Sequence, residues 1–131
     1  DLIIIRDVIE HIKNKETVYK FVNNLQKELN IHRLNRFIEI RFLKKLEEEA
    51  LGYCWGDHEH VEIEICRDQS WKDQMITLAH EMVHAKQFLR KELVGDKWKK
   101  RNYSKCQYDR QPWEISAYLM QDKLYNLCYP D

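Results

Sequence analysis

At residues 70–91 the chain reads SWKDQMITLAHEMVHAKQFLRK. Ser70 is a residue type that favours the position just before a helix, and Asp73 would lie in the first turn, where a negative charge interacts favourably with the helix dipole. Apolar residues recur at helical spacing and form one stripe: Met75, Leu78, Ala79, Met82 and Val83. The stretch predicts an amphipathic helix from about Trp71 to about Lys91.

Two histidines and a glutamate lie on the flank of this predicted helix. His80 and His84 are one turn apart, so both imidazoles project from the same face and can reach one metal ion. Glu81 lies roughly 100° round the helix from His80, where its carboxylate can reach a water molecule beside the metal rather than the metal itself. The H-E-x-x-H pattern therefore predicts a zinc (Zn2+) site with His80 and His84 as ligands and Glu81 as general base.

A catalytic zinc ion normally takes a third protein ligand. No histidine follows His84, and Gln87 and Arg90 stand where a metzincin has glycine and histidine, so that class is excluded. The remaining candidates are Glu92, Asp96, Cys106, Asp109, Glu114 and Asp122. We favour Glu114, because it lies near the start of the last predicted helix, and the small Ala117 one turn on would let the two helices pack closely.

Three runs between residues 37 and 65 predict strands. Phe37–Leu43 alternates apolar and charged residues, and Leu51–Trp55 and Glu59–Ile65 are two further runs joined at the turn-forming pair Gly56-Asp57. We expect them to form a small, mostly antiparallel three-stranded sheet.

Helices are predicted at both ends of the chain. Glu16–Asn30 has apolar residues at helical spacing, whereas Leu2–Ile5 fits either a short strand or the continuation of a helical stripe. Lys97–Gln111 has no clean period and is interpreted as a loop over the sheet and the central helix. Pro112 suits the first position of a last helix, which is expected to bury Ile115, Leu119, Leu124 and Leu127.

The bulk composition points to one domain spanning residues 1–131. Lys plus Arg and Asp plus Glu both number 22, so the net charge is zero and provides no general attraction to nucleic acid or to membranes. The run Trp98–Tyr103 mixes basic and aromatic residues, but one such run is typical of a solvated loop, and we do not expect nucleic acid as a partner.

The four cysteines form no C-x-x-C pair, which favours reduced thiols. The apolar stretch Leu2–Ile5 is far too short for a membrane span or a signal-peptide core. These features indicate a cytoplasmic location and no membrane partner.

These motifs carry a family resemblance. His80-Glu81-x-x-His84 followed by Glu114-x-x-Ala117 resembles the gluzincins, zinc metallopeptidases with a glutamate ligand, in a minimal form. The run from Leu78 to Ala85 is similar to the active-site helix of SprT-like metallopeptidases, which use a downstream histidine that this chain lacks. The run from Gln111 to Ala117 resembles small zincin-like proteins of tailed phages and related viruses, for which the intracellular location would be a host cell.

The resemblance implies an α+β, zincin-like fold and a zinc-dependent peptidase acting on a peptide or protein substrate. Glu81 would move the proton of the attacking water, and Tyr103 or Tyr108 would donate to the oxyanion. The substrate would add as a strand along Val61–Ile65, where Glu62 and Glu64 would favour basic sequences. Some gluzincins have an aspartate partner four residues after the glutamate ligand, at the position of Tyr118 here.

Other interpretations remain open. The chain can be a catalytically silent zincin-like binding module, associated with nucleic acid through Lys97–Lys105, or a form in which the loop Lys97–Gln111 covers the metal. We expect His58 and His60 to be solvated rather than metal ligands, and Cys106 to be an idle thiol rather than an inhibitory ligand.

Overall fold

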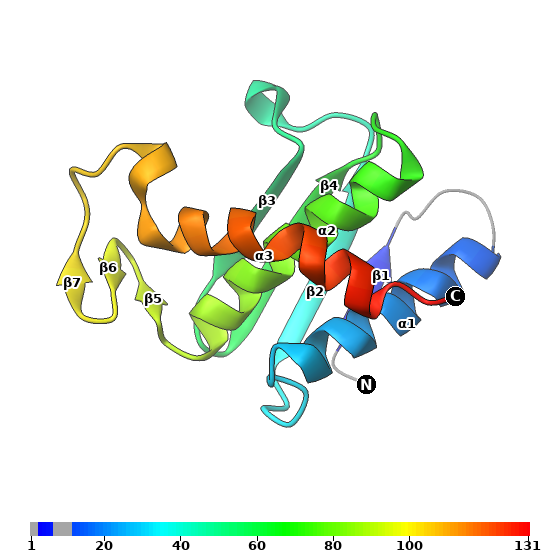
Figure 1. Ribbon diagram of the computed structural model, residues 1–131, viewed down its shortest axis with the longest axis horizontal. Helices are drawn as coiled ribbons and strands as arrows, with labels where there is room; N and C mark the ends of the chain where they lie inside the picture. Colours follow the sequence, from blue (N-terminus) through cyan, green and yellow to red (C-terminus); the bar gives the residue numbers. More distant parts are fainter. Residues whose placement is uncertain (1–2, 7–11) are drawn as a thin grey trace.

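The computed structural model describes residues 3–6 and 12–131 (Figure 1). The described chain contains three α-helices, α1 (Ile12–Glu28), α2 (Trp71–Leu89) and α3 (Pro112–Cys128). The main sheet contains β1 (Ile3–Arg6), β2 (Phe37–Leu43), β3 (Gly52–Gly56) and β4 (His60–Cys66). The predicted α+β class is therefore confirmed, as are the three predicted strands and the helices at 16–30, 71–91 and from 112.

The arrangement of the sheet differs from the prediction. Its order is β1-β2-β4-β3, and only the β3–β4 pair is antiparallel, whereas β1–β2 and β2–β4 are parallel. The prediction of a mostly antiparallel sheet was wrong. The connection after β2, which contains the 3-10 turn η1 (Glu47–Glu49), does not place β3 next to β2. Instead β4 lies between β2 and β3 and pairs with both, which leaves β3 at the edge of the sheet.

The start of the chain adds the fourth strand. Ile3–Arg6 pairs in register with residues 38–41 of β2, so the strand alternative for this segment is confirmed. The expected helical stripe through Val8 and Ile9 lies outside the described residues.

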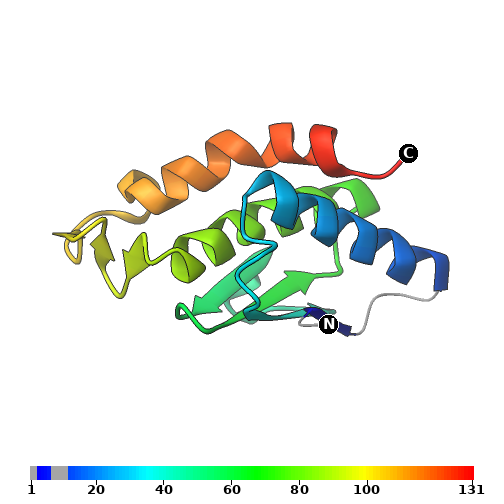
Figure 2. The same cartoon turned by 90° about the horizontal axis from the view of Figure 1, so that it is seen from below.

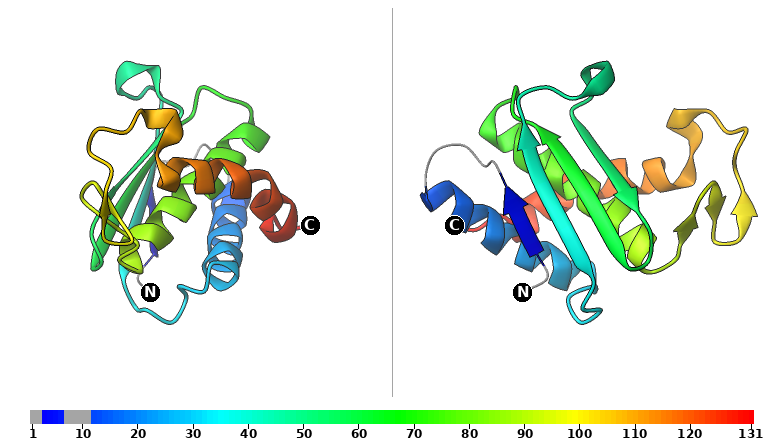
Figure 3. Two further views of the ribbon diagram at one scale, coloured as in Figure 1. Left: turned by 60° about the vertical axis from the view of Figure 1, so that its left-hand side comes forward. Right: turned by 180° about the vertical axis from the view of Figure 1, so that it is seen from behind.

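All three helices lie on one side of the main sheet. Figure 2 shows α1 and α2 against the sheet and α3 above them, and the view from behind in Figure 3 shows the opposite sheet face uncovered. Successive residues of a strand face opposite sides of the sheet, so every second side chain faces the helices and is buried in the core. These buried residues are Ile3, Ile5, Ile38, Ile40, Phe42, Val61, Ile63 and Ile65. Glu62 and Glu64 alternate with these residues and lie on the uncovered face.

The start of α2 follows the predicted cap. The Ser70 hydroxyl accepts a hydrogen bond from the Asp73 backbone N–H at 3.1 Å, and Asp73 lies in the first turn. Leu78, Ala79, Met82 and Val83 are all buried, so the predicted apolar stripe is confirmed.

The buried face of α3 is not the predicted one. Leu124 is buried as expected, but Ile115 and Leu127 are exposed and Leu119 is 78% exposed. The buried residues are Trp113, Glu114, Ala117, Leu124 and Cys128. The helix is therefore turned so that Glu114, rather than the row through Ile115, faces α2.

The segment predicted as a loop contains short regular elements. β6 (Lys97–Trp98) and β7 (Arg101–Asn102) form a separate antiparallel ribbon with β5 (Leu93–Val94), which precedes the predicted loop, and the 3-10 turn η2 (Tyr108–Arg110) follows them. The ribbon projects from the end of α2 (Figure 1). Among the described helices, none combines the length and the apolar character needed to cross a membrane.

Candidate metal centre

The two histidines of α2 and the glutamate of α3 meet in one buried cluster. His80 Nε2 and His84 Nε2 each lie 3.1 Å from a carboxylate oxygen of Glu114. One ligand atom from each of the three residues lies within 4.8 Å of the other two, and all three residues are buried. The cluster can therefore hold a metal ion with two imidazole nitrogens and a carboxylate oxygen as donors.

Helix packing produces this geometry. His80 and His84 are one turn apart on α2, and Glu114 lies in the first turn of α3, which runs side by side with α2 (Figures 1 and 2). Ala117 is fully buried one turn after Glu114. A small side chain there permits close approach of the helices, as the sequence predicts.

Each imidazole contacts one glutamine through Nδ1, the ring nitrogen that faces away from Glu114. His80 Nδ1 lies 2.9 Å from Gln121 Oε1, and His84 Nδ1 lies 2.8 Å from Gln87 Oε1. An amide oxygen can only accept, so in this arrangement each Nδ1 carries a proton and donates to its glutamine. The Glu114 carboxylate also only accepts, so a metal ion would take the place of the proton between Nε2 and Glu114, and each histidine would then coordinate through Nε2.

Glu81 lies beside the cluster and is only 6% exposed. Burial raises the pKa of its carboxyl to about 7, although His84 and His80 act in the opposite direction. Gly52 of β3 lies against this carboxylate, since a Cβ at that position would be 2.8 Å from Glu81 Oε2. The edge strand thus confines a carboxyl group whose pKa suits proton exchange near neutral pH.

Glu114 and His84 shift each other's pKa in opposite directions. Burial alone would raise the pKa of Glu114, but hydrogen bonds with His80 and His84 outweigh burial and hold the pKa at about 2. Burial would lower the pKa of His84, but its contacts with Glu114 and Glu81 raise it overall. A cation between these groups would take the place of the proton held by His84.

A cavity of about 370 Å³ opens beside the cluster. His80 and Glu81 form part of its wall, and the remaining lining residues are Glu49, Ala50, Leu51, Gly52, Thr77, Tyr108, Tyr118 and Gln121. The cavity therefore lies between the edge strand, α2, α3 and η2, and provides space for a ligand next to Glu81.

The two predicted tyrosines are placed differently. Tyr108 lines the cavity, and its hydroxyl interacts with Tyr118 and with the Glu114 carboxylate. Tyr108 is 59% exposed overall, but desolvation of its hydroxyl and the nearby Glu114 charge raise its pKa further above the neutral range, so the phenol is protonated and can donate. Tyr103 instead packs edge-on against Trp113, with ring centroids 6.1 Å apart, and is not among the residues lining the cavity.

Sequence reasoning missed Gln87, Gln121, Gly52 and Tyr118 as parts of this site. The Tyr118 ring packs edge-on against His80, with centroids 4.5 Å apart. Gln87 and Gln121 could have been found by helical spacing, because Gln87 is three residues after His84 and Gln121 is two turns after Glu114. Gly52 is close to Glu81 only through the sheet order, which the sequence did not reveal.

Other residues considered as ligands lie apart from the cluster. His60 is exposed and forms a second group with Glu39 and Glu62 on the uncovered sheet face. In that group Glu39 is bonded to Arg6 and Glu62 to the Trp55 indole, as expected of a solvated surface. His58 lies 3.7 Å from Glu59.

The candidate Cys106 also lies outside the ligand set, as does Cys54. Cys106 follows the ribbon and donates its backbone N–H to Tyr103 O. Cys54 of β3 is closer to the site, where burial and then the charges of Glu81 and Glu114 raise the pKa of its thiol well above the usual range.

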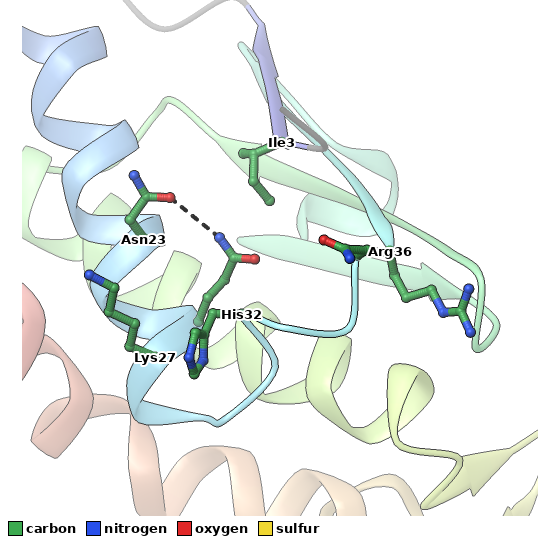
Figure 4. Close-up of a pocket in the computed structure, with 7 residues that line it drawn as sticks. Ile3, Asn23, Lys27, His32 and Arg36 are labelled. Atoms are coloured by element: carbon green, nitrogen blue, oxygen red, sulfur yellow. Dashed lines mark hydrogen bonds between the residues drawn. The ribbon is translucent and has the colours of Figure 1, made fainter.

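A separate hollow of about 460 Å³ lies between the end of α1 and the start of β2 (Figure 4). Lys27, His32 and Arg36 line it without a carboxylate among the lining residues. Figure 4 shows the Arg36 side chain directed away from Lys27 and His32, so the three cations do not converge on one point. We assign no ligand to this hollow.

Comparison with protein-family models, curated proteins and solved structures finds no match to this chain. The case for function therefore rests on the site itself. A buried His80-His84-Glu114 cluster that can hold a metal ion lies beside a carboxyl group of raised pKa and a solvent-open cavity.

Proposed function

We propose that the protein is a zinc-dependent hydrolase of the zincin type, acting as a peptidase. The observation that carries the proposal is the meeting of His80, His84 and Glu114, whose ligand atoms lie within 4.8 Å of one another with Glu81 alongside. Two imidazoles and one carboxylate are the donor set of many catalytic zinc sites, which keep a fourth position open.

The residues present fit a zinc ion. Both Nδ1 atoms are engaged by glutamine oxygens, so Nε2 is the nitrogen that each ring would offer to a metal, on the side where the Glu114 carboxylate lies. Bound zinc would supply Lewis acidity toward a substrate carbonyl and a water molecule.

Glu81 is the proton carrier in this proposal. Its carboxylate faces the cavity from the helix turn that holds His80, where it can accept a proton from water and return it to the leaving amine. The low exposure of Glu81 restricts competing proton exchange with bulk water.

Tyr108 is the proposed donor to the developing oxyanion. Its protonated phenol lies in the cavity wall and already interacts with Glu114. A preorganised donor at this place would stabilise charge that appears only during the reaction. Tyr103 packs against Trp113, which favours Tyr108 over Tyr103 for this role.

The substrate strand is assigned to β3 in place of Val61–Ile65. β4 pairs with both β2 and β3, so its backbone groups are already used, whereas β3 pairs only with β4 among the described strands. An extended peptide added to the free edge of β3 would pass Gly52 and the adjoining cavity. Glu62 and Glu64 lie on the uncovered face, so they do not support the expected preference for basic sequences.

The test is hydrolysis of a peptide library by the zinc-loaded protein and by Glu81→Gln. We expect cleavage by the wild type, and a fall of at least about 100-fold in turnover in the variant, the lower end of general acid–base contributions, with zinc retained. Equal turnover in both proteins would refute the role of Glu81. Zinc binding without hydrolysis of any peptide would instead favour a silent binding module.

A further inference from the structure

We infer that Gln87 is the positioning residue that sets the metal-binding geometry before a metal arrives, and that Gln121 is a weaker partner. The inference rests on the proposed zinc site. Both residues contact an imidazole through a side-chain amide, Gln87 at His84 and Gln121 at His80, but they differ in exposure to solvent.

Gln87 is 1% exposed, and both ends of its amide are used. Its Oε1 lies 2.8 Å from His84 Nδ1, and its Nε2 donates to the Trp113 backbone carbonyl at 3.0 Å. Trp113 immediately precedes Glu114 in the chain. One side chain of α2 therefore holds a ligand of its own helix and the backbone next to the ligand of α3.

The amide orientation follows from these two contacts. The Trp113 carbonyl can only accept, so the NH₂ group of Gln87 must face it, and the oxygen must then face His84. His84 therefore keeps a proton on Nδ1, which leaves Nε2 as the nitrogen that can coordinate a metal. The packing of the two helices thus determines which nitrogen of His84 is available.

Gln121 makes a similar contact in a wetter place. Its Oε1 lies 2.9 Å from His80 Nδ1, but the residue is only half-buried and lines the open cavity. Water can replace an amide oxygen at such a position with little loss. Gln87 is closed to bulk solvent, so loss of its oxygen leaves the His84 ring without a partner.

The experiment compares zinc affinity, by chelator competition, for Gln87→Met, Gln87→Glu and Gln121→Met. Methionine keeps the side-chain volume but removes the hydrogen bonds, whereas glutamate keeps the acceptor for His84. We expect Gln87→Met to lose about 10- to 100-fold in affinity, the range found for partners of metal-bound histidines. Gln87→Glu and Gln121→Met should stay within a few-fold of the wild type.

Several results would overturn the inference. Unchanged affinity in Gln87→Met would do so, as would an equal loss in Gln87→Glu, which would show that the acceptor for His84 is not what maintains zinc affinity. An equal loss in Gln121→Met would refute the difference between the two glutamines. These outcomes are separate from the peptidase proposal, which fails if the wild type binds zinc and cleaves nothing.

A measurement on the wild type covers the case in which Gln87→Met does not fold. In the zinc-loaded protein, nitrogen-detected spectra of the imidazoles should show Nδ1–H on both rings, with slower solvent exchange for His84 than for His80. Equal or faster exchange at His84 would contradict the inference.

Discussion

Among single residues, Glu81 shows both a benefit and a cost of burial. Its buried position supports proton transfer, but a charged carboxylate there is poorly solvated, which is why burial raises its pKa to about 7. Glu114 shows the opposite balance, because two imidazoles outweigh its burial and hold its pKa at about 2. Neighbouring glutamates of one site are thus tuned for different roles, proton carrier and ligand.

The raised pKa of Glu81 predicts that the metal-free protein is destabilised by this residue at neutral and higher pH. The folded pKa lies above the ordinary value of 4.5, so folding favours the protonated carboxyl, and stability falls as the pH rises from about 4.5 to 7. Glu81→Gln lacks this titration. We expect both proteins to be similarly stable at pH 4, and the variant to be more stable by up to about 3 kcal/mol at pH 8.

Urea unfolding of both metal-free proteins at the two pH values measures this difference. The contrasting result is a variant that is less stable than the wild type at pH 8, or a stability difference that does not change with pH. Either result would show that burial does not raise the pKa of Glu81.

At the scale of elements, the contact between β3 and α2 positions Glu81. A Cβ on Gly52 would lie 2.7 Å from Thr77 Cγ2 and 2.8 Å from Glu81 Oε2, closer than van der Waals contact allows. We expect Gly52→Ala to displace the Glu81 carboxylate, lowering peptide turnover by about 10- to 100-fold while zinc stays bound.

Thr77→Ser provides a matched background for this test. Serine removes the Cγ2 methyl but keeps the hydroxyl that bonds to Gln69 at 3.2 Å. In the double variant Gly52→Ala/Thr77→Ser the new Cβ no longer overlaps a methyl group at residue 77, but it still overlaps the Glu81 carboxylate. Relative to Gly52→Ala, thermal stability should therefore recover more than turnover. Full recovery of turnover would show that Thr77, not Glu81, is the residue displaced.

Local signals predicted the elements well and their arrangement less well. The alternation in Phe37–Leu43 and the Ser70 cap are encoded in adjacent residues, and both are confirmed. The sheet order depends on how far the connection after β2 carries the chain, which no local pattern encodes. The parallel β2–β4 pair, and with it the edge position of β3, was therefore missed.

The prediction for α3 contained two incompatible expectations. Ile115 lies about 100° round a helix from Glu114, so both cannot point directly at the same neighbour. The structure turns Glu114, Ala117 and Leu124 inward, and leaves Leu119 exposed. The helical spacing of the ligand was a better guide to this face than hydrophobicity.

At the scale of the whole molecule, the candidate metal centre joins two helices that are separated in sequence by the ribbon and η2. α2 lies against the sheet and provides His80, His84 and Glu81, while α3 packs over α2 and provides Glu114 (Figure 2). The H-E-x-x-H spacing alone identified the α2 residues. The sequence pointed to Glu114 because other candidates could be set aside and because the small Ala117 lies one turn later. Helix packing brings Glu114 to the histidines.

The proposed function depends on His80, His84 and Glu114 binding one zinc ion together. The most direct test is the zinc content, after dialysis against a weak chelator, of the wild type, Glu114→Ala and Asp122→Ala. Asp122 is an exposed acidic residue of the same helix and serves as the matched control. We predict one zinc per chain in the wild type and in Asp122→Ala, and loss of zinc in Glu114→Ala. Full zinc content in Glu114→Ala would contradict the assigned ligand set, and absence of zinc from the wild type would contradict the site itself.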